Sequence, residues 1–260
     1  MSVIFHPPYG LGRLGNALFR YMATILLCNK YDLSYNSLYY NKEHTTLNDD
    51  TFEKIFVYNQ SIDIKGPILL NEFYQFDIYI DHKNEIIEFM NKYKDNHYIK
   101  TDRKDNHNTY KISDIINNNN VPIYNTVLHI RLEDFVTANE LINVYYIIEL
   151  LKTINIDELN NMAIVVNKIT TQFELNYINT LTNWLKENNI NYNIESNDII
   201  TDFQIMKQCI NFISSKSTLA WCASILSSSI NKCYFPNYKK TRYQQFNRPH
   251  TNTLYYNIGE

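Results

Sequence analysis

Residues 128 to 135 read Leu-His-Ile-Arg-Leu-Glu-Asp-Phe and gather polar side chains at the end of a short apolar run. Arg131 is a fixed cation whose planar fork suits a diphosphate, and His129 could hydrogen-bond a base or a ribose. Ligands bind at such strand ends in parallel sheets. A surface ion-pair group is the alternative, and the spacing alone does not decide between the two.

A second candidate is the glycine loop, residues 10 to 16, which reads Gly-Leu-Gly-Arg-Leu-Gly-Asn and holds three of the five glycines. Backbone N–H groups at such a loop, between a strand and a helix, can bind phosphate. The spacing Gly-x-Gly-x-x-Gly is that of dinucleotide sites, but no acidic residue follows at a convincing second strand end. A tight turn without a ligand is the alternative.

A third candidate is the segment 213 to 218, Ile-Ser-Ser-Lys-Ser-Thr, where a strand gives way to a helix. Hydroxyl groups and the first N–H groups of the helix could together bind an anion. Plain capping of the helix by Ser215 or Ser217 explains the same residues. With one such turn in the first half of the chain and two in the second, we expect them to face each other across a cleft.

The elements that position these turns follow from the apolar pattern. A strand is expected at 3–6, a helix from 16, a short helix near 52–58, a strand at 67–70 and a helix at 78–92. Residues 93 to 121 are polar without periodicity and are taken as the passage between two domains. Beyond them we expect strand 126–130, helix 138–153, strand 162–166, helix 172–188, strand 192–195, helix 201–209, strand 212–214, helix 218–227 and strand 233–235. This alternation is typical of a parallel, doubly wound α/β sheet.

Composition excludes some functions. The chain has 260 residues, 45% of them hydrophobic, and a formal net charge of -3, which makes general nucleic-acid binding an unexpected function. The four cysteines show no paired spacing and are predicted to be reduced core thiols. No basic leader precedes the first strand, and the apolar run 17–28 is too short to span a bilayer, so we expect a cytoplasmic protein without a transmembrane segment.

Four motifs in order resemble the fucosyltransferase superfamily, and in particular the α-1,2-fucosyltransferases of bacteria and their relatives (glycosyltransferase family 11-like). Gly-Arg-Leu-Gly-Asn-Ala-Leu-Phe-Arg-Tyr-Met at 12–22 is similar to the family's Gly-Gly-Leu-Gly-Asn-Gln-Leu-Phe-Gln-Tyr-Ala. Leu-Asn-Glu-Phe-Tyr-Gln-Phe-Asp-Ile-Tyr at 70–79 resembles its tyrosine-phenylalanine-glutamine segment. Residues 129–135 resemble its His-x-Arg-Arg-x-Asp-Tyr motif, and residues 215–223 its Ser-Asn-Ser-Thr-Phe-Ser-Trp-Trp-Ala stretch.

The resemblance implies an α/β protein of the GT-B fold, with two Rossmann-like domains facing across a cleft. Residues 1–120 would form the N-terminal domain, on the acceptor side and carrying the glycine loop. Residues 121–240 would form the nucleotide-sugar-binding domain. Residues 241–260 would form a C-terminal tail that could pack back on the N-terminal domain.

The resemblance also implies roles for site residues. Arg131 would grip the donor diphosphate, His129 and Asp202 would contact the region of the nucleobase, and Ser217 and Thr218 would hold phosphate oxygens. The donor-binding set is Gly12, Arg13, Gly15, Asn16, His129, Arg131, Asp202, Ser215, Ser217 and Thr218.

The implied reaction is an inverting, metal-independent transfer of fucose or a related deoxysugar from a nucleoside diphosphate, with GDP-fucose favoured, to a glycan hydroxyl. The partners are then a sugar nucleotide and a glycan acceptor, without a cofactor. Positive charge, from Arg131 first of all, must stabilise the departing diphosphate. A carboxylate must take the acceptor's proton, and Asp134 is the first candidate, then Glu133 and Glu140. Each could equally be a plain surface charge.

Three departures from the family pattern bear on the donor. Leu132 replaces the second arginine, Lys216 replaces the asparagine and Cys222 replaces the second tryptophan. Lys216 or Arg13 could supply the missing charge. Two other functions stay open: a catalytically silent glycan- or nucleotide-binding protein that keeps the fold, and a nicotinamide-dependent oxidoreductase, suggested only by the glycine spacing.

Overall fold

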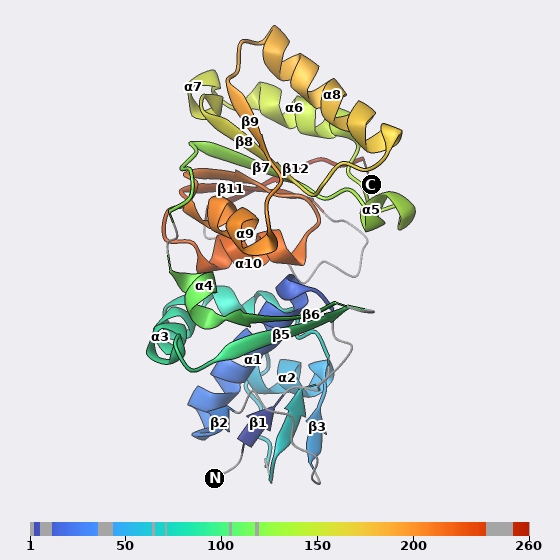
Figure 1. Cartoon of the computed structure of the whole chain (residues 1–260). Coiled ribbons are helices and arrows are strands. Elements are labelled where there is room, and N and C mark those ends of the chain that lie inside the picture. The colour runs from blue at the N-terminus through green and yellow to red at the C-terminus, as the bar shows by residue number, and fades with distance from the viewer. Residues whose placement is uncertain are drawn as a thin grey trace. The chain divides into compact units, whose positions relative to one another are not determined.

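The computed structural model describes residues 3–5, 12–35, 44–63, 66–70, 72–103, 106–117, 120–237 and 252–259. Contacts divide the chain into two units, Met1–Asn117 and Asn118–Glu260 (Figure 1). Gly10 of the glycine loop and residues 241–251 of the expected tail lie outside the described residues.

The first unit contains a parallel four-stranded sheet in the order β2-β1-β4-β3. Its strands are β1 (Val3–Phe5), β2 (Ser34–Tyr35), β3 (Thr45–Leu47) and β4 (Ile68–Leu70). Its helices are α1 (Leu14–Tyr31), α2 (Asp49–Phe56), the 3₁₀ helix η1 (Asp77–Ile80), α3 (Lys83–Tyr93) and α4 (Ile112–Ile116).

Helix α1 is buried on almost every side, from Leu14 through Cys28. A helix that is apolar all round belongs in a core. It ends where Asp32 adopts a left-handed conformation and donates its backbone N–H to the carbonyl of Cys28. Phe19 of α1 packs against Tyr79 at 5.7 Å between ring centroids, which joins the helix to a largely aromatic core.

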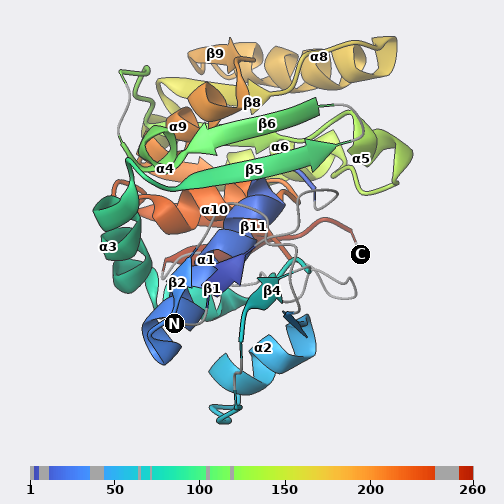
Figure 2. The ribbon, with the colours of Figure 1, turned by 60° about the horizontal axis from the view of Figure 1, so that its bottom comes forward.

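Residues 93 to 121 contain more structure than the sequence predicted. β5 (Tyr98–Arg103) and β6 (Asn106–Lys111) form an antiparallel pair, visible as the two long arrows in Figure 2. Ile99 and Thr101 are buried and the intervening Lys100 is exposed, so the alternation of a half-buried strand is present but brief. Backbone hydrogen bonds hold the two strands of the hairpin together, so few of its residues need to be apolar.

The second unit contains a six-stranded sheet in the order β12-β11-β10-β7-β8-β9, with every pair parallel. The strands are β7 (Thr126–Ile130), β8 (Met162–Val166), β9 (Tyr192–Glu195), β10 (Asn211–Ile213), β11 (Lys232–Pro236) and β12 (Thr253–Tyr256). The predicted α/β organisation around a parallel sheet is confirmed.

Helices cover both faces of this sheet. They are α5 (Asp134–Thr137), α6 (Val144–Thr153), α7 (Ile156–Leu159), α8 (Gln172–Glu187), α9 (Ile199–Gln208) and α10 (Thr218–Leu226). In Figure 1, α6 and α8 lie on one side of β7 to β9, and α9 and α10 lie on the other. Every residue of β7 and β8 is buried, as a strand covered on both faces requires.

The helix expected at 138–153 needs correction, since it begins only at Val144. Asn139 adopts a left-handed conformation, and Asn143 caps α6 by accepting from the N–H of Tyr145 at 3.0 Å. Within the expected tail, residues 253–256 form β12, which pairs with β11 in the second unit's sheet. Tyr256 is the buried residue of β12.

All four cysteines are buried and free, as predicted. Of the helices that the structure describes, none has the length and apolar character needed to cross a membrane.

Candidate functional site

The second sheet has a switch point between β7 and β10. From β7 the chain proceeds outward to β8 and β9, and then returns to the other side of β7 to form β10. Ligands of open parallel sheets bind at the carboxyl ends of the strands where the two directions diverge. Because Leu128 lies opposite Ile213 across this pair, the polar residues that follow each strand come together at one edge.

His129 links the two strand ends. Its Nδ1 lies 2.9 Å from Oγ of Ser215, a hydrogen bond between the end of β7 and the loop after β10. The imidazole is 6% exposed, and burial lowers its pKa to about 4. His129 is therefore neutral near pH 7 and fixes Ser215. A contact with a nucleobase stays a prediction.

Arg131 is the cation at this edge. Its side chain is 16% exposed, and its Nε and Nη2 donate to Oδ1 of Asp134 at 3.2 and 3.1 Å. Its guanidinium also lies 5.5 Å from the ring centroid of Phe135. The sequence alone did not decide whether these residues form an ion pair. The structure contains this ion pair, and its guanidinium is mostly buried rather than on an open surface. A guanidinium has five N–H donors, and this pair uses two of them.

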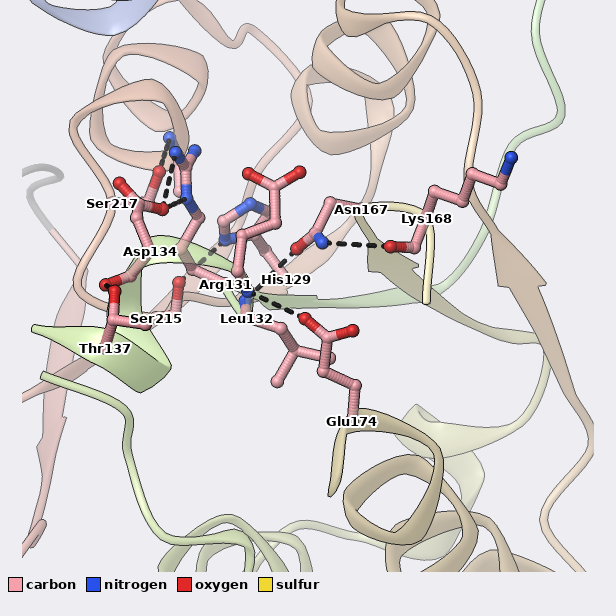
Figure 3. A network of polar contacts seen from close by, with 12 residues as sticks. His129, Arg131, Leu132, Asp134, Thr137, Asn167, Lys168, Glu174, Ser215 and Ser217 are labelled. Carbon is pink, nitrogen blue, oxygen red and sulfur yellow. Dashed lines mark hydrogen bonds and ion pairs between the residues drawn. The ribbon is translucent and has the colours of Figure 1, made fainter. Parts of the chain in front are cut away.

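The loop after β7 is held by side chains from two other elements, as Figure 3 shows. The backbone N–H of Leu132 donates to Oδ1 of Asn167 at 3.1 Å, and that of Glu133 donates to Oε1 of Glu174 at 3.1 Å. Glu133 has a φ of 44°, which is uncommon for any residue but glycine. These two hydrogen bonds fix the strained backbone that lies between Arg131 and Asp134.

Glu174 was not anticipated as a site residue. It is 2% exposed and also accepts from the N–H groups of Thr170 and Thr171 and the hydroxyl of Thr170, at 2.8 to 3.0 Å. Burial alone would raise its pKa, but the hydrogen bonds outweigh it and lower the pKa to about 2. Its sequence signal was the capping box Thr171-x-x-Glu174, which the structure forms at the start of α8.

The side chain of Leu132 lies outside this polar network. Its side chain is fully buried in the apolar core with Ile130 and Ile164. Ile130 and Leu132 point to the core and Arg131 away from it, as the two-residue period of extended backbone requires. At the position where the resemblance would put a second arginine, this chain therefore has a core residue.

The segment after β10 forms the N-terminus of α10. Ser217 is its N-cap and accepts from the N–H of Ala220 at 3.4 Å, while its own N–H donates to the carbonyl of Ser215 at 2.8 Å. Thr218 is the first helical residue. The capping that was the alternative interpretation is present, and it brings the positive end of the helix to the same edge as His129.

Asp202 is not joined to these residues by its hydrogen bonds. It lies in the first turn of α9 and accepts from the N–H and Nδ2 of Asn197 at 3.1 and 3.2 Å. Burial raises its pKa. Helix α9 contacts α10 and β7, but these hydrogen bonds of Asp202 do not reach His129, Arg131 or Ser217, so its predicted role at the nucleobase rests on the resemblance alone.

In the first unit, the described part of the glycine loop precedes α1. Gly12 has a φ of +88°, and a Cβ there would lie 2.7 Å from Nδ2 of Asn16, so glycine is required. Asn16 accepts from Nε2 of Gln75 at 2.9 Å. Arg13 is the N-cap residue of α1, and Gly15 is buried in its first turn. The hydrogen bond from Gln75 joins two of the motifs that carry the family resemblance.

No protein-family model matches this chain, and no curated protein matches its sequence. Two solved structures are similar in backbone course. A mutant of FUT1 from Arabidopsis thaliana in complex with GDP has a TM-score of 0.49 and 10% identity, over 93% of this chain and 72% of that one. POFUT1 in complex with GDP has a TM-score of 0.46 and 10% identity, over 90% of this chain and 98% of that one.

Proposed function

We propose that this chain is a glycosyltransferase and that the β7–β10 edge of its second unit binds a nucleoside diphosphate sugar. The observation that carries the proposal is Arg131, a mostly buried guanidinium at the switch point of a parallel sheet. The N-terminus of α10 and the hydrogen-bonded pair of His129 and Ser215 adjoin it in the same network (Figure 3). A fixed cation beside a helix N-terminus suits a diphosphate.

In the proposed reaction an acceptor hydroxyl attacks the anomeric carbon of the donor. A carbon–oxygen bond forms to the acceptor as the bond to the diphosphate breaks on the opposite face, so the configuration inverts. The electron pair leaves with the nucleoside diphosphate, and Arg131 stabilises its charge. The hydroxyl proton passes to a carboxylate.

Asp134 is the proposed base, ahead of Glu133 and Glu140. In the structure its Oδ1 is occupied by Arg131. A donor diphosphate that engages Arg131 would compete with this ion pair and release the carboxylate to accept a proton. Donor binding would then prepare the base, which predicts that acceptor deprotonation follows donor binding.

GDP-fucose is the favoured donor, because the four motifs resemble fucosyltransferases. With Leu132 in the core, the family's second cation is missing, and Lys216 or Arg13 is the proposed replacement. The first unit, with the glycine loop Gly12 to Asn16, would be the acceptor side of a two-domain GT-B enzyme. The protein is expected to act in the cytoplasm without a metal.

The test is release of nucleoside diphosphate from GDP-fucose, other GDP-sugars, UDP-sugars and dTDP-sugars by the purified protein, with and without EDTA. We expect turnover of a GDP-deoxysugar that EDTA does not affect. Arg131→Lys keeps the charge but loses the fork, so its rate should fall about 10-fold or more. Turnover of no donor, together with no binding of GDP, UDP or dTDP, would disprove the proposal.

A second function is favoured by one specific observation. Arg131 is closed onto Asp134, and the position of the second arginine is a buried leucine, so the fold could bind a nucleotide without transferring its sugar. Calorimetry separates the two functions. Donor binding that depends on Arg131, with no product from any acceptor, would identify a catalytically silent binding protein.

A further inference from the structure

A depression of about 380 Å³ lies in the second unit, outside the network of His129 and Arg131. Three segments form it: α5 with the loop that follows, the start of α6, and the first half of α8. Its lining residues are Val136, Asn139, Leu141, Asn143, Val144, Phe173, Asn176, Tyr177 and Thr180. None of these side chains is charged.

The lining combines an open aromatic face with amide groups. The Phe173 side chain is 54% exposed, which is unusual for a large apolar residue inside a surface depression. Around it are the amides of Asn139, Asn143 and Asn176 and the hydroxyl of Thr180. An apolar ring bordered by a few placed polar groups is a typical binding-site composition.

Several of these groups are held in place by the protein. Tyr177 donates its hydroxyl to the carbonyl of Ile142 at 2.7 Å, which fixes the ring at the base of the depression. Asn143 uses Oδ1 to cap α6, and Asn176 uses Oδ1 to accept from Gln172 at 2.8 Å. In both residues the capping or bridging bond engages the oxygen and leaves the amide nitrogen as a donor.

We propose that this depression binds a neutral saccharide. A pyranose ring presents an apolar C–H face, which can stack on Phe173, and a rim of hydroxyls, which amide side chains can hydrogen-bond. A nucleotide or other anion would need a cation, and the lining has none. A purely apolar ligand would strip water from three amides and a hydroxyl and would offer no hydrogen bonds in its place.

The position of this site suggests what the saccharide would do. Val136 lies two residues after Asp134 in α5, and Phe173 directly precedes Glu174, which holds the loop of Arg131. A glycan bound here would therefore be anchored beside the donor edge of the same unit. That it belongs to the acceptor rests on the proposed function, whereas saccharide binding itself does not.

Saturation-transfer NMR with lactose, cellobiose, maltose and chitobiose tests the inference, with binding constants from chemical-shift titration. We expect at least one to bind, with saturation transferred from aromatic protons. Phe173→Ala should weaken binding about 10-fold, because the aromatic face on which the sugar ring stacks is lost. Asn176→Ala should weaken it about 5-fold through a lost hydrogen bond.

Leu175→Ala is the matched control, since this residue is an exposed apolar side chain of α8 that does not line the depression. Its binding constant should stay within about 2-fold of wild type, as expected for a surface residue without a contact. The inference is overturned if no disaccharide binds, if Phe173→Ala binds as tightly as wild type, or if hexanol binds and the disaccharides do not.

Arg131→Ala separates this inference from the proposed function. It should leave saccharide binding unchanged while removing nucleotide binding. Saccharide binding without any nucleotide binding would disprove the donor site and keep this one. Nucleotide turnover with no saccharide binding at Phe173 would keep the donor site and disprove the saccharide site.

Discussion

The strands of the first unit's sheet are two or three residues long, whereas β7, β8 and β11 of the second unit have five each. Short strands make few ladder hydrogen bonds, and the first unit compensates with aromatic packing. The ring of Phe52 lies within 6.2 Å of the rings of Phe56, Tyr74, Phe76 and Tyr79. The core of the second unit is mainly aliphatic.

The polar side chains of the two units also have different roles. In the first unit the hydroxyls of Tyr74 and Tyr79 donate to the backbone carbonyls of Leu47 and Tyr74, so they join loops to the core. In the second unit the polar side chains lie at the carboxyl ends of strands and hold one another at the sheet's edge. The polar side chains of the second unit thus build a site at the ends of regular strands, while these two tyrosine hydroxyls of the first unit support its core.

The largest effect that we predict is on the first unit's core. Phe52→Ala should lower the free energy of unfolding by about 3–5 kcal/mol, because it leaves a cavity among four rings. Urea unfolding followed by circular dichroism measures the loss. Trp184 and Trp221 both belong to the second unit, so their fluorescence reports that unit separately. A loss below about 1 kcal/mol would contradict the importance of the aromatic core.

Glu174→Ala should have the next largest effect. It removes the acceptor of three backbone N–H groups and should cost about 3 kcal/mol by urea unfolding. Glu174→Gln keeps the shape and an acceptor oxygen, so it should cost less. Equal losses in the two variants would show that the side chain's volume, and not its hydrogen bonding, matters.

Two histidines, one in each unit, give a pH test. Burial lowers the pKa of His129 and of His97 to about 4, whereas an unfolded histidine titrates near 6.5. Between these values the unfolded chain binds more protons, so stability falls as the pH drops. His129 alone should cost about 2 kcal/mol between pH 7 and pH 5.

Guanidinium unfolding at both pH values checks this for wild type, His129→Gln and His97→Gln. The His129 variant should lose less stability on acidification than wild type. The His97 variant should show a reduction of similar size, because burial lowers the pKa of His97 to about 4 as well. If the His129 variant loses as much stability on acidification as wild type, the lowered pKa of His129 is not the cause of that loss.

The smallest effect concerns two glycines with positive φ. Gly12→Ala should cost about 1–2 kcal/mol, because the added Cβ has both a strained backbone and a contact with Asn16. Gly66 has a φ of +76° but no atom within 4 Å of the Cβ position. Gly66→Ala therefore measures the stability cost of the strained backbone alone. Thermal unfolding of both variants then gives the cost of the contact with Asn16 as the difference between the two losses. An equal cost in both would show that the contact with Asn16 is negligible.

Much of the second unit could be predicted from sequence, because its central strands β7 and β8 are buried, mostly apolar runs. Strands 126–130, 162–166 and 192–195 have the predicted bounds. The hairpin at 98–111 could not, because Ile99 and Thr101 are the buried residues among those of its side chains that the structure describes. The start of α6 at Val144 was also missed, since the left-handed conformation of Asn139 has no strong signal.

Sequence placed His129 near the end of a predicted strand and Arg131 and Ser215 just after predicted strands, and the parallel topology brings these strand ends together. It could not show that Asn167 and Glu174 hold the loop between Arg131 and Asp134, because those contacts span 35 and 41 residues. The site roles of Asp202 and of the glycine loop stay predictions. Asp202 is bonded to Asn197, and Gly12 belongs to the other unit.

The central claim is that Arg131 binds a diphosphate at the β7–β10 edge. Calorimetric titration of GDP into wild type and Arg131→Gln tests it most directly, with unfolding curves to show that the variant is folded. The account predicts binding to wild type and roughly a 10- to 100-fold weaker constant for the variant, the loss expected of a hydrogen bond to a charged group. Equal affinity in the two proteins would contradict it.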